Sequence, residues 1–167
     1  MGRPMRIKLF GRSSVVAALT IVFTLLVCGA AEAGPFSALA GAWAGGGVLT
    51  ISSAREPIRC RAIYFVADAG ESLRLILRCA SDSYNIDVNA DAVAHGDRFS
   101  GTWSEQSSGT SGSLGGVVRG AVIEGAISGL GVSAPLLIVT HGHSQHASIS
   151  LGGPSVAVVV VNFRRAY

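Results

Sequence analysis

Apolar and polar residues alternate along most of the chain, in short runs separated by Gly, Asp, Asn and Ser. A period of two is typical of half-buried β-strands, and turn residues about every ten positions are typical of antiparallel sandwiches and barrels. We expect strands at residues 47–53, 58–67, 72–79, 83–90, 98–106, 112–118, 121–128, 132–140, 143–150 and 155–164. Because only short turns remain between them, we predict an all-β antiparallel meander that closes into a barrel of about 8–10 strands, with a two-sheet sandwich as the alternative.

The pattern between residues 58 and 79 predicts one hairpin in detail. The register that matches the two apolar faces places Cys60 opposite Cys79, whereas a shift of one residue would bury Arg74 and Arg78. Directly opposed residues of antiparallel strands have Cβ atoms about 4.5–5.5 Å apart, so a disulfide needs little movement. The other facing pairs are Val66 with Leu73, Tyr64 with Leu75, and Ala62 with Leu77. We therefore predict a Cys60–Cys79 disulfide.

The strand expected at residues 83–90 extends the same sheet. Its alternation predicts the facing pairs Leu77 with Tyr84, Leu75 with Ile86, Leu73 with Val88, and Arg74 with Asp87. An exposed ion pair contributes under about 1 kcal/mol, so Arg74 and Asp87 would mark the register more than they stabilise it.

The outer face of the predicted hairpin carries Ile63, Phe65 and Ile76. Scattered exposed apolar residues are ordinary in soluble proteins, but a contiguous apolar patch marks a contact surface. These three residues are therefore either covered by a strand, a loop or arginine stems of this chain, or they form a surface for a partner.

The first part of the chain has the pattern of a secretory signal peptide. Residues 1–12 carry basic side chains and no acid, residues 13–30 form an uncharged apolar run, and Ala31 and Ala33 supply an A-x-A cleavage site. We predict a signal peptide at residues 1–33 and an exported protein in the periplasm or extracellular space. The alternative is a membrane anchor through the uncleaved run at 13–30.

The predicted domain, residues 34–167, has nine Arg, no Lys and nine acidic residues, so its formal net charge is zero. Nucleic-acid-binding proteins usually carry a basic excess, and this domain has none, so nucleic acid is not an expected partner. An even cysteine count in an exported domain also favours a disulfide.

Three histidines lie within "THGHSQH", residues 140–146. His141 and His143 have the spacing that a strand could use to bind a metal ion. Gly142 between them favours a turn instead, and His146 would project from the opposite face to His143. We expect neither a metal site nor a cofactor. No G-x-S-x-G nucleophile motif or other catalytic constellation is present, so we do not expect an enzyme.

Glu105 follows Trp103 by two residues and therefore shares its face of the strand. If that face points inward, a carboxylate enters the barrel or lies at its rim. A buried carboxylate is costly unless it is paired. We expect Glu105 either to form an ion pair with Arg98 or Arg119, or to contact a ligand.

The stretch "LAGAWAGGGVLTI", residues 39–51, contains a G-x-W motif at Gly41–Trp43, and "SGTWSE", residues 100–105, repeats the element. The motif resembles the opening strand of lipocalin-like (calycin) barrels, in which the Trp closes the barrel floor. The motif with the following cysteine pair is similar, more weakly, to bacterial metalloprotease inhibitors, and the chain resembles other small exported bacterial β-barrel proteins. The resemblance implies a floor or ligand-contact role for Trp43, and by repetition for Trp103.

Together these patterns predict a non-enzymatic exported β-barrel that binds a small apolar or amphipathic ligand. The alternative is a cell-envelope module that acts through its surface, by protein interaction or in the manner of a protease inhibitor. The expected partner is thus a small ligand or an envelope protein, and membrane contact is expected only through the uncleaved signal segment.

Overall fold

The computed structural model describes residues 33–129, 132–151 and 157–167. Apart from Ala33, the expected signal segment lies outside these ranges. The strands are β1 (Gly41–Ile51), β2 (Ala54–Ala67), β3 (Ser72–Ala80), β4 (Asn85–His95), β5 (Arg98–Glu105), β6 (Thr110–Arg119), β7 (Val122–Gly129), β8 (Val132–His141), β9 (Ser144–Leu151) and β10 (Ala157–Arg165). Two short 3-10 helices are η1 (Ser37–Leu39) and η2 (Asp68–Gly70). All ten expected strands are present, and most of their ends agree to within a few residues, but β1 begins six residues earlier than expected and β4 ends five residues later.

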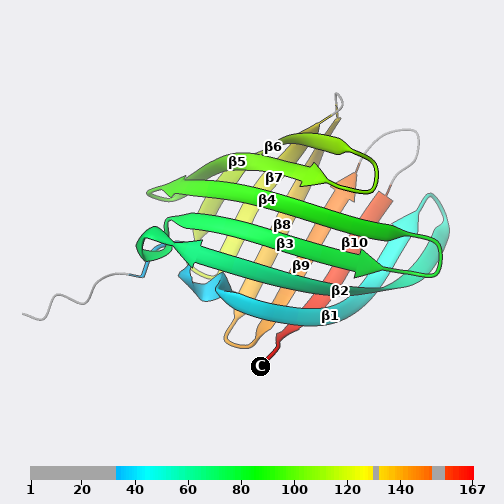
Figure 1. The fold of residues 1–167 in the computed structure, drawn as a ribbon, viewed down its shortest axis with the longest axis horizontal. Helices are drawn as coiled ribbons and strands as arrows, with labels where there is room; N and C mark the ends of the chain where they lie inside the picture. The colour runs from blue at the N-terminus through cyan, green and yellow to red at the C-terminus, as the bar shows by residue number, and fades with distance from the viewer. Residues whose placement is uncertain (1–32, 130–131, 152–156) are drawn as a thin grey trace, which may run out of the picture. The chain divides into compact units, whose positions relative to one another are not determined.

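Every strand pairs antiparallel with the next, and β1 pairs with β10, so the meander closes into a ten-stranded barrel. The predicted barrel is confirmed, and the alternative sandwich is not what forms. Strands β2–β5 make one layer, and β7–β10 make a second layer whose strands cross the first steeply (Figure 1). No helix in the described ranges is long and apolar enough to cross a membrane.

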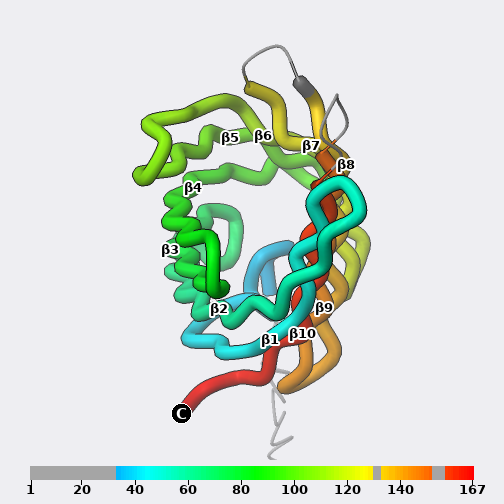
Figure 2. Tube along the Cα trace, turned by 90° about the vertical axis from the view of Figure 1, so that its right-hand side faces the viewer, coloured from blue at the N-terminus to red at the C-terminus, as the bar shows by residue number. Residues whose placement is uncertain are grey.

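The sheet turns from one layer to the other at β1 and at β5–β6 (Figure 2), and these strands contain several glycines. A Cβ at Gly47 of β1 would lie 1.8 Å from the carbonyl oxygen of Val160, and one at Gly112 of β6 would lie 1.8 Å from that of Ser128. No side chain fits such an approach, so these glycines allow neighbouring strands to fold sharply onto each other. The glycine-rich stretches 110–119 and 122–129 thus form the strands β6 and β7.

The register predicted for β2 and β3 is confirmed. Cys60 pairs with Cys79 across the two strands, their Cα atoms are 4.0 Å apart, and the disulfide is formed. Both cysteines are buried on the inner face. The apolar faces and the cysteines predicted the same register because both sets of side chains are buried on the inner face of the sheet.

The register predicted for β3 and β4 is wrong by four residues. Leu77 faces Val88 rather than Tyr84, and Arg74 faces Asp91 rather than Asp87. A shift by an even number keeps every side chain on its predicted face, so alternation alone cannot detect it. The observed register makes two ion pairs where the predicted one makes one, because Asp87 is left to bind Arg78. Tyr84 falls in the turn and is exposed.

One end of the barrel, which we call the closed end, is sealed by η1 and by Trp43. The indole nitrogen of Trp43 donates a hydrogen bond to the carbonyl oxygen of Leu39 at 2.7 Å. The Arg165 guanidinium lies over the indole ring, 4.5 Å from its centroid, and donates to the carbonyl oxygens of Ala38 and Ala40. Phe36 is buried beside these residues. The first and last strands of the barrel are thus fastened together at this end.

Candidate functional site

The barrel interior, here called the lumen, is lined by apolar side chains that keep partial solvent exposure. Examples from opposite walls are Leu77 on β3 and Leu136 on β8. The others include Ile51, Leu75, Ile86, Leu114 and Val159. In a filled core such side chains would be close-packed and shielded from water. These inward-facing side chains therefore keep partial solvent access while they pack against the fully buried core.

Small residues widen the lumen along β4 and β5. Ala90 faces Trp103, and Ala92 faces Gly101, all on the inner side of the sheet. An eight-stranded barrel already has room for side chains or one small ligand, and barrel diameter grows with strand number. A ten-stranded barrel with alanine and glycine on its inner wall is thus consistent with a ligand-binding module.

A buried polar network lies in the interior and was not predicted. The Tyr64 hydroxyl donates to the side-chain oxygen of Gln145 at 3.0 Å, and the Gln145 amide donates to the Thr140 hydroxyl at 3.2 Å. Burial raises the pKa of Tyr64, and the hydrogen bond to Gln145 opposes this in part. The sequence could have indicated this, because Gln145 lies two residues before Ala147 on the same strand and therefore shares its inward face. Because these groups bind one another, they leave the lumen mainly apolar.

Trp103 forms part of the lumen wall. Its indole nitrogen donates to the carbonyl oxygen of Ser128 at 3.2 Å, and its ring passes close to Gly112 and Gly129. The absence of side chains at these two glycines gives the indole its place against β6 and β7. Trp103 is partly exposed, whereas Trp43 is buried at the closed end, so the two tryptophans occupy different environments.

Glu105 holds the turn between β5 and β6. One carboxylate oxygen accepts hydrogen bonds from the amides of Asp87 at 3.1 Å and Ser107 at 3.0 Å. The other accepts from the amide and the hydroxyl of Ser108, both at 2.6 Å. These bonds, first the one from the Ser108 hydroxyl and next that from the Asp87 amide, lower the pKa of Glu105 to about 2.

The expected ion pair between Glu105 and Arg98 or Arg119 is not what forms. Arg98 begins β5 and Glu105 ends it, so the two lie a strand length apart. Arg119 pairs with Glu124 instead, at 3.3 Å. The carboxylate of Glu105 is instead bound by the amides of Ser107 and Ser108, which follow it directly in the chain.

Glu105→Gln is expected to lower the free energy of unfolding by about 1 kcal/mol at pH 7, since a partly exposed carboxylate loses charge-assisted hydrogen bonds. The folded-state pKa of about 2 lies below the ordinary value of 4.5, so the contribution is present above pH 4.5 and is lost as pH falls towards 2. Denaturant titrations of the wild-type and variant proteins from pH 7 to pH 2 should therefore converge at acid pH. Glu124→Gln is the control, and a constant difference at every pH would contradict the assignment.

The histidines of residues 140–146 lie at the closed end, away from the lumen. The strands β8 and β9 turn at residues 142–143, and His143 contacts the Tyr167 hydroxyl through its Nδ1 at 3.2 Å. His146 faces outward and shares a hydrogen bond of 2.9 Å with Asn162. In the described part of the chain no three His, Cys, Asp or Glu residues come together as a metal site.

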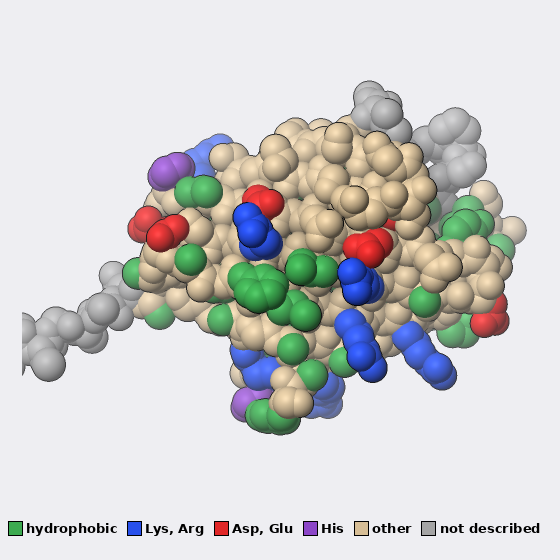
Figure 3. Space-filling model, in the orientation of Figure 1, with side chains coloured by type: hydrophobic (Ala, Val, Ile, Leu, Met, Phe, Trp, Pro, Cys, Tyr) green, Lys and Arg blue, Asp and Glu red, His purple; other side chains and the backbone are tan. Residues whose placement is uncertain are grey.

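The three apolar residues Ile63, Phe65 and Ile76, for which covering by this chain and contact with a partner were the two alternatives, lie on the outer wall and are here called the apolar patch. Ile63 faces Ile76 across β2 and β3, and the side chains of Ile63 and Phe65 are 41% and 53% exposed. Figure 3 shows apolar side chains gathered on this face between charged ones. A surface hollow of about 690 Å³ includes Phe65 and Ile76 in its lining. Ile76 is partly buried, so the exposed part of the patch consists mainly of Ile63 and Phe65.

Comparison with known proteins supports the fold. No family model matches the chain, and no curated protein matches it significantly. Among solved structures it is similar to Rv2717c from M. tuberculosis, with a TM-score of 0.61 and 16% sequence identity over 78% of this chain and 94% of that chain. At this identity the likeness shows the fold alone, a closed antiparallel barrel, which fits the lipocalin-like resemblance.

Proposed function

We propose that the protein is an exported, non-enzymatic barrel that binds a small apolar or amphipathic ligand in its lumen. The observation that carries this proposal is the partial solvent exposure of inward-facing apolar side chains on opposite walls, among them Leu77 and Leu136. Covering exposed apolar surface with a ligand makes the free energy of binding more favourable by about 25 cal/mol for each Å² buried. The lumen therefore favours apolar occupants over water.

The chemistry of the lining supports an apolar ligand rather than a polar one. Small-molecule sites are mostly apolar with few polar groups that fix orientation. Among the described residues, every buried side-chain nitrogen and oxygen has a hydrogen-bond partner, so a ligand has no buried polar group to satisfy. Export is supported by the disulfide, since such bonds persist in oxidising compartments.

Leu136→Trp is expected to weaken ligand binding by about tenfold or more, because the larger side chain fills the lumen. The probe is N-phenyl-1-naphthylamine, a neutral fluorophore that brightens in apolar surroundings, titrated into the purified protein. Leu137→Trp is the matched control, because Leu137 faces outward on the same strand, opposite Glu124 and Ser148, and should leave affinity unchanged. A tenfold loss corresponds to about 1.4 kcal/mol, well within what one blocked apolar contact supplies.

Two results would count against lumen binding. One is a wild-type protein that does not brighten the probe, and the other is an equal loss of affinity in both variants. Thermal melts of each variant separate a filled lumen from a disrupted fold. The alternative function, as a protein-interaction or inhibitor-like module, stays a prediction that rests on the exposed apolar patch.

A further inference from the structure

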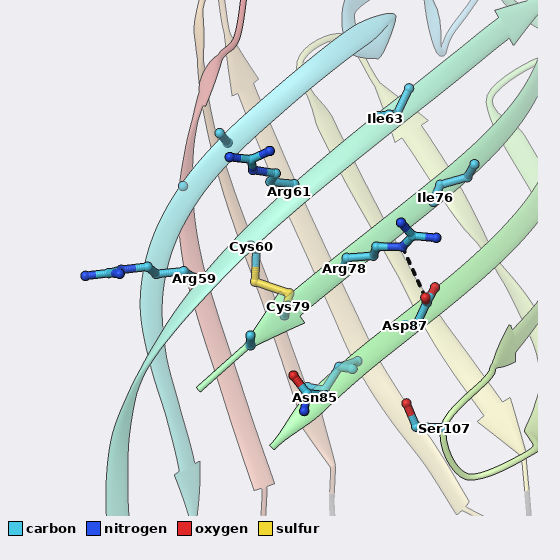
Figure 4. A pocket seen from close by; sticks show the side chains of 14 residues that line it. Arg59, Cys60, Arg61, Ile63, Ile76, Arg78, Cys79, Asn85, Asp87 and Ser107 are labelled. Carbon is cyan, nitrogen blue, oxygen red and sulfur yellow. Dashed lines mark hydrogen bonds and ion pairs between the residues drawn. A yellow bond between two sulfur atoms is a disulfide. The ribbon is translucent and has the colours of Figure 1, made fainter. Parts of the chain in front are cut away.

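Arginines gather on the outer wall beside the apolar patch. Arg59, Arg61 and Arg78 line a surface hollow of about 770 Å³ over β1–β4 (Figure 4). Arg61 lies directly opposite Arg78 across β2 and β3. Like charges that face each other across strands destabilise a sheet. A carboxylate or a bound anion beside the pair would offset this repulsion.

The carboxylates of the chain compensate only part of this charge. Arg78 is paired with Asp87 at 3.1 Å, and outside the hollow Arg74 is paired with Asp91 at 2.8 Å. Among the described residues, no carboxylate lies within ion-pair distance of Arg59 or Arg61. Because the acidic and basic residues of the domain are equal in number, this local excess is a matter of placement and not of composition.

The residues around the two uncompensated arginines leave room for an anion. Arg61 faces Ala44 of β1, and Arg59 faces Gly46, so neither guanidinium meets a bulky neighbour on that side. Figure 4 shows the Arg59 and Arg61 side chains extending from β2 towards β1. Ser107 lines the hollow from across β4 and supplies a neutral hydrogen-bond donor.

The hollow is amphipathic, because apolar side chains form its other border. Ile63 and Ile76 line it together with the arginines, and both belong to the apolar patch that continues to Phe65. A ligand seated on the arginines would therefore lay any attached apolar chain against this patch. An inorganic ion would use only the basic half of the hollow.

We propose that this hollow binds a phosphate-bearing amphiphile. The phosphate head lies on Arg59 and Arg61, and the apolar chain lies over Ile63 and Ile76. A phosphate suits the site better than a carboxylate, since it offers three acceptor oxygens and up to two charges to several guanidinium groups. The site is on the outer wall, so it is independent of the lumen proposal.

The test is calorimetric titration of the purified protein with dodecyl phosphate below its micelle concentration. We expect the Arg59→Gln/Arg61→Gln variant to bind about tenfold more weakly or worse, because two charge-assisted contacts are lost. Arg98→Gln is the matched control, an exposed outward arginine at the start of β5, and should bind as the wild type does. Absence of wild-type binding, or an equal loss in the control, overturns the proposal.

Two further variants separate the head, the chain and the lumen. Ile63→Ser should weaken dodecyl phosphate binding and leave the weaker binding of inorganic phosphate unchanged. Leu136→Trp should leave dodecyl phosphate binding unchanged, and if it abolishes binding, the amphiphile enters the lumen and the outer site is wrong. Dodecyltrimethylammonium should not bind the hollow, and displacement of dodecyl phosphate by it would also overturn the assignment.

The amphiphile could come from a membrane or be released from one, and sedimentation with vesicles distinguishes these sources. Phosphatidylcholine vesicles with and without phosphatidic acid are mixed with the wild-type protein and with Arg59→Gln/Arg61→Gln. Arginine-dependent binding to the phosphatidic acid vesicles supports a head group that stays in its bilayer. Binding of monomeric dodecyl phosphate alone supports a released amphiphile in the same hollow.

Discussion

Cys60→Ala/Cys79→Ala is expected to lower the free energy of unfolding by about 3 kcal/mol. The disulfide joins residues separated by 19 positions, and closing a loop of that size removes about 3 kcal/mol of conformational entropy from the unfolded chain. For a domain of this size the melting temperature should fall by about 10 °C. The measurement is thermal and denaturant unfolding of the oxidised wild type beside the double variant.

A reducing agent provides the internal control for this prediction. Dithiothreitol should lower the stability of the wild type towards that of the double variant, whereas it should leave the double variant unchanged. Because both cysteines are buried, reduction should be slow below the unfolding transition. Equal stabilities of the oxidised wild type and the double variant would show that the crosslink constrains little in the unfolded chain.

Trp43→Ala is expected to lower the free energy of unfolding by about 3–5 kcal/mol, the usual cost of removing a fully buried aromatic side chain. The indole is 1% exposed, and its loss leaves a cavity at the closed end. It also removes the hydrogen bond to Leu39 and the contact with the Arg165 guanidinium. Denaturant unfolding of the variant measures the loss.

Trp103→Ala is the matched control for Trp43→Ala. Trp103 has one hydrogen bond, to Ser128, and is partly exposed to the lumen, so its removal should cost only about half as much. A larger loss at Trp103 than at Trp43 would contradict the assignment of the barrel floor to Trp43. If the Trp43 variant does not fold at all, Trp43→Phe provides a milder change at the same site.

The sequence predicted the strands and one register because those features depend on local alternation. Cys60 and Cys79 added a second constraint to β2 and β3, so a single register satisfied both. The register between β3 and β4 had only one constraint, a possible ion pair of Arg74. Asp87 and Asp91 lie on the same face of β4, so either could have been its partner. An even shift costs nothing on the inner face, so only the ion pairs along the whole strand could decide it.

The candidate sites were less predictable because they join strands that are distant in the chain. Ile63, Phe65 and Ile76 were found from alternation alone. The arginine hollow was missed, since it depends on what lies opposite Arg61 on both sides, Arg78 on β3 and Ala44 on β1. The lumen also draws residues from almost every strand, so alternation within one strand could not show which side chains face each other across it.

The pairing of β1 with β10 sets an order on the folding of this chain. One edge of Gly41–Ile51 pairs with the next strand, β2, but its other edge meets a partner only when Ala157–Arg165 is present. The sheet therefore cannot close until nearly the whole domain is available. Until then, two long strand edges can pair with other chains, which is the usual route to aggregation. If the chain crosses a membrane before it folds, these edges form only afterwards, which delays the risk of aggregation. If the last strand were lost, the edges would stay unpaired and the risk would persist.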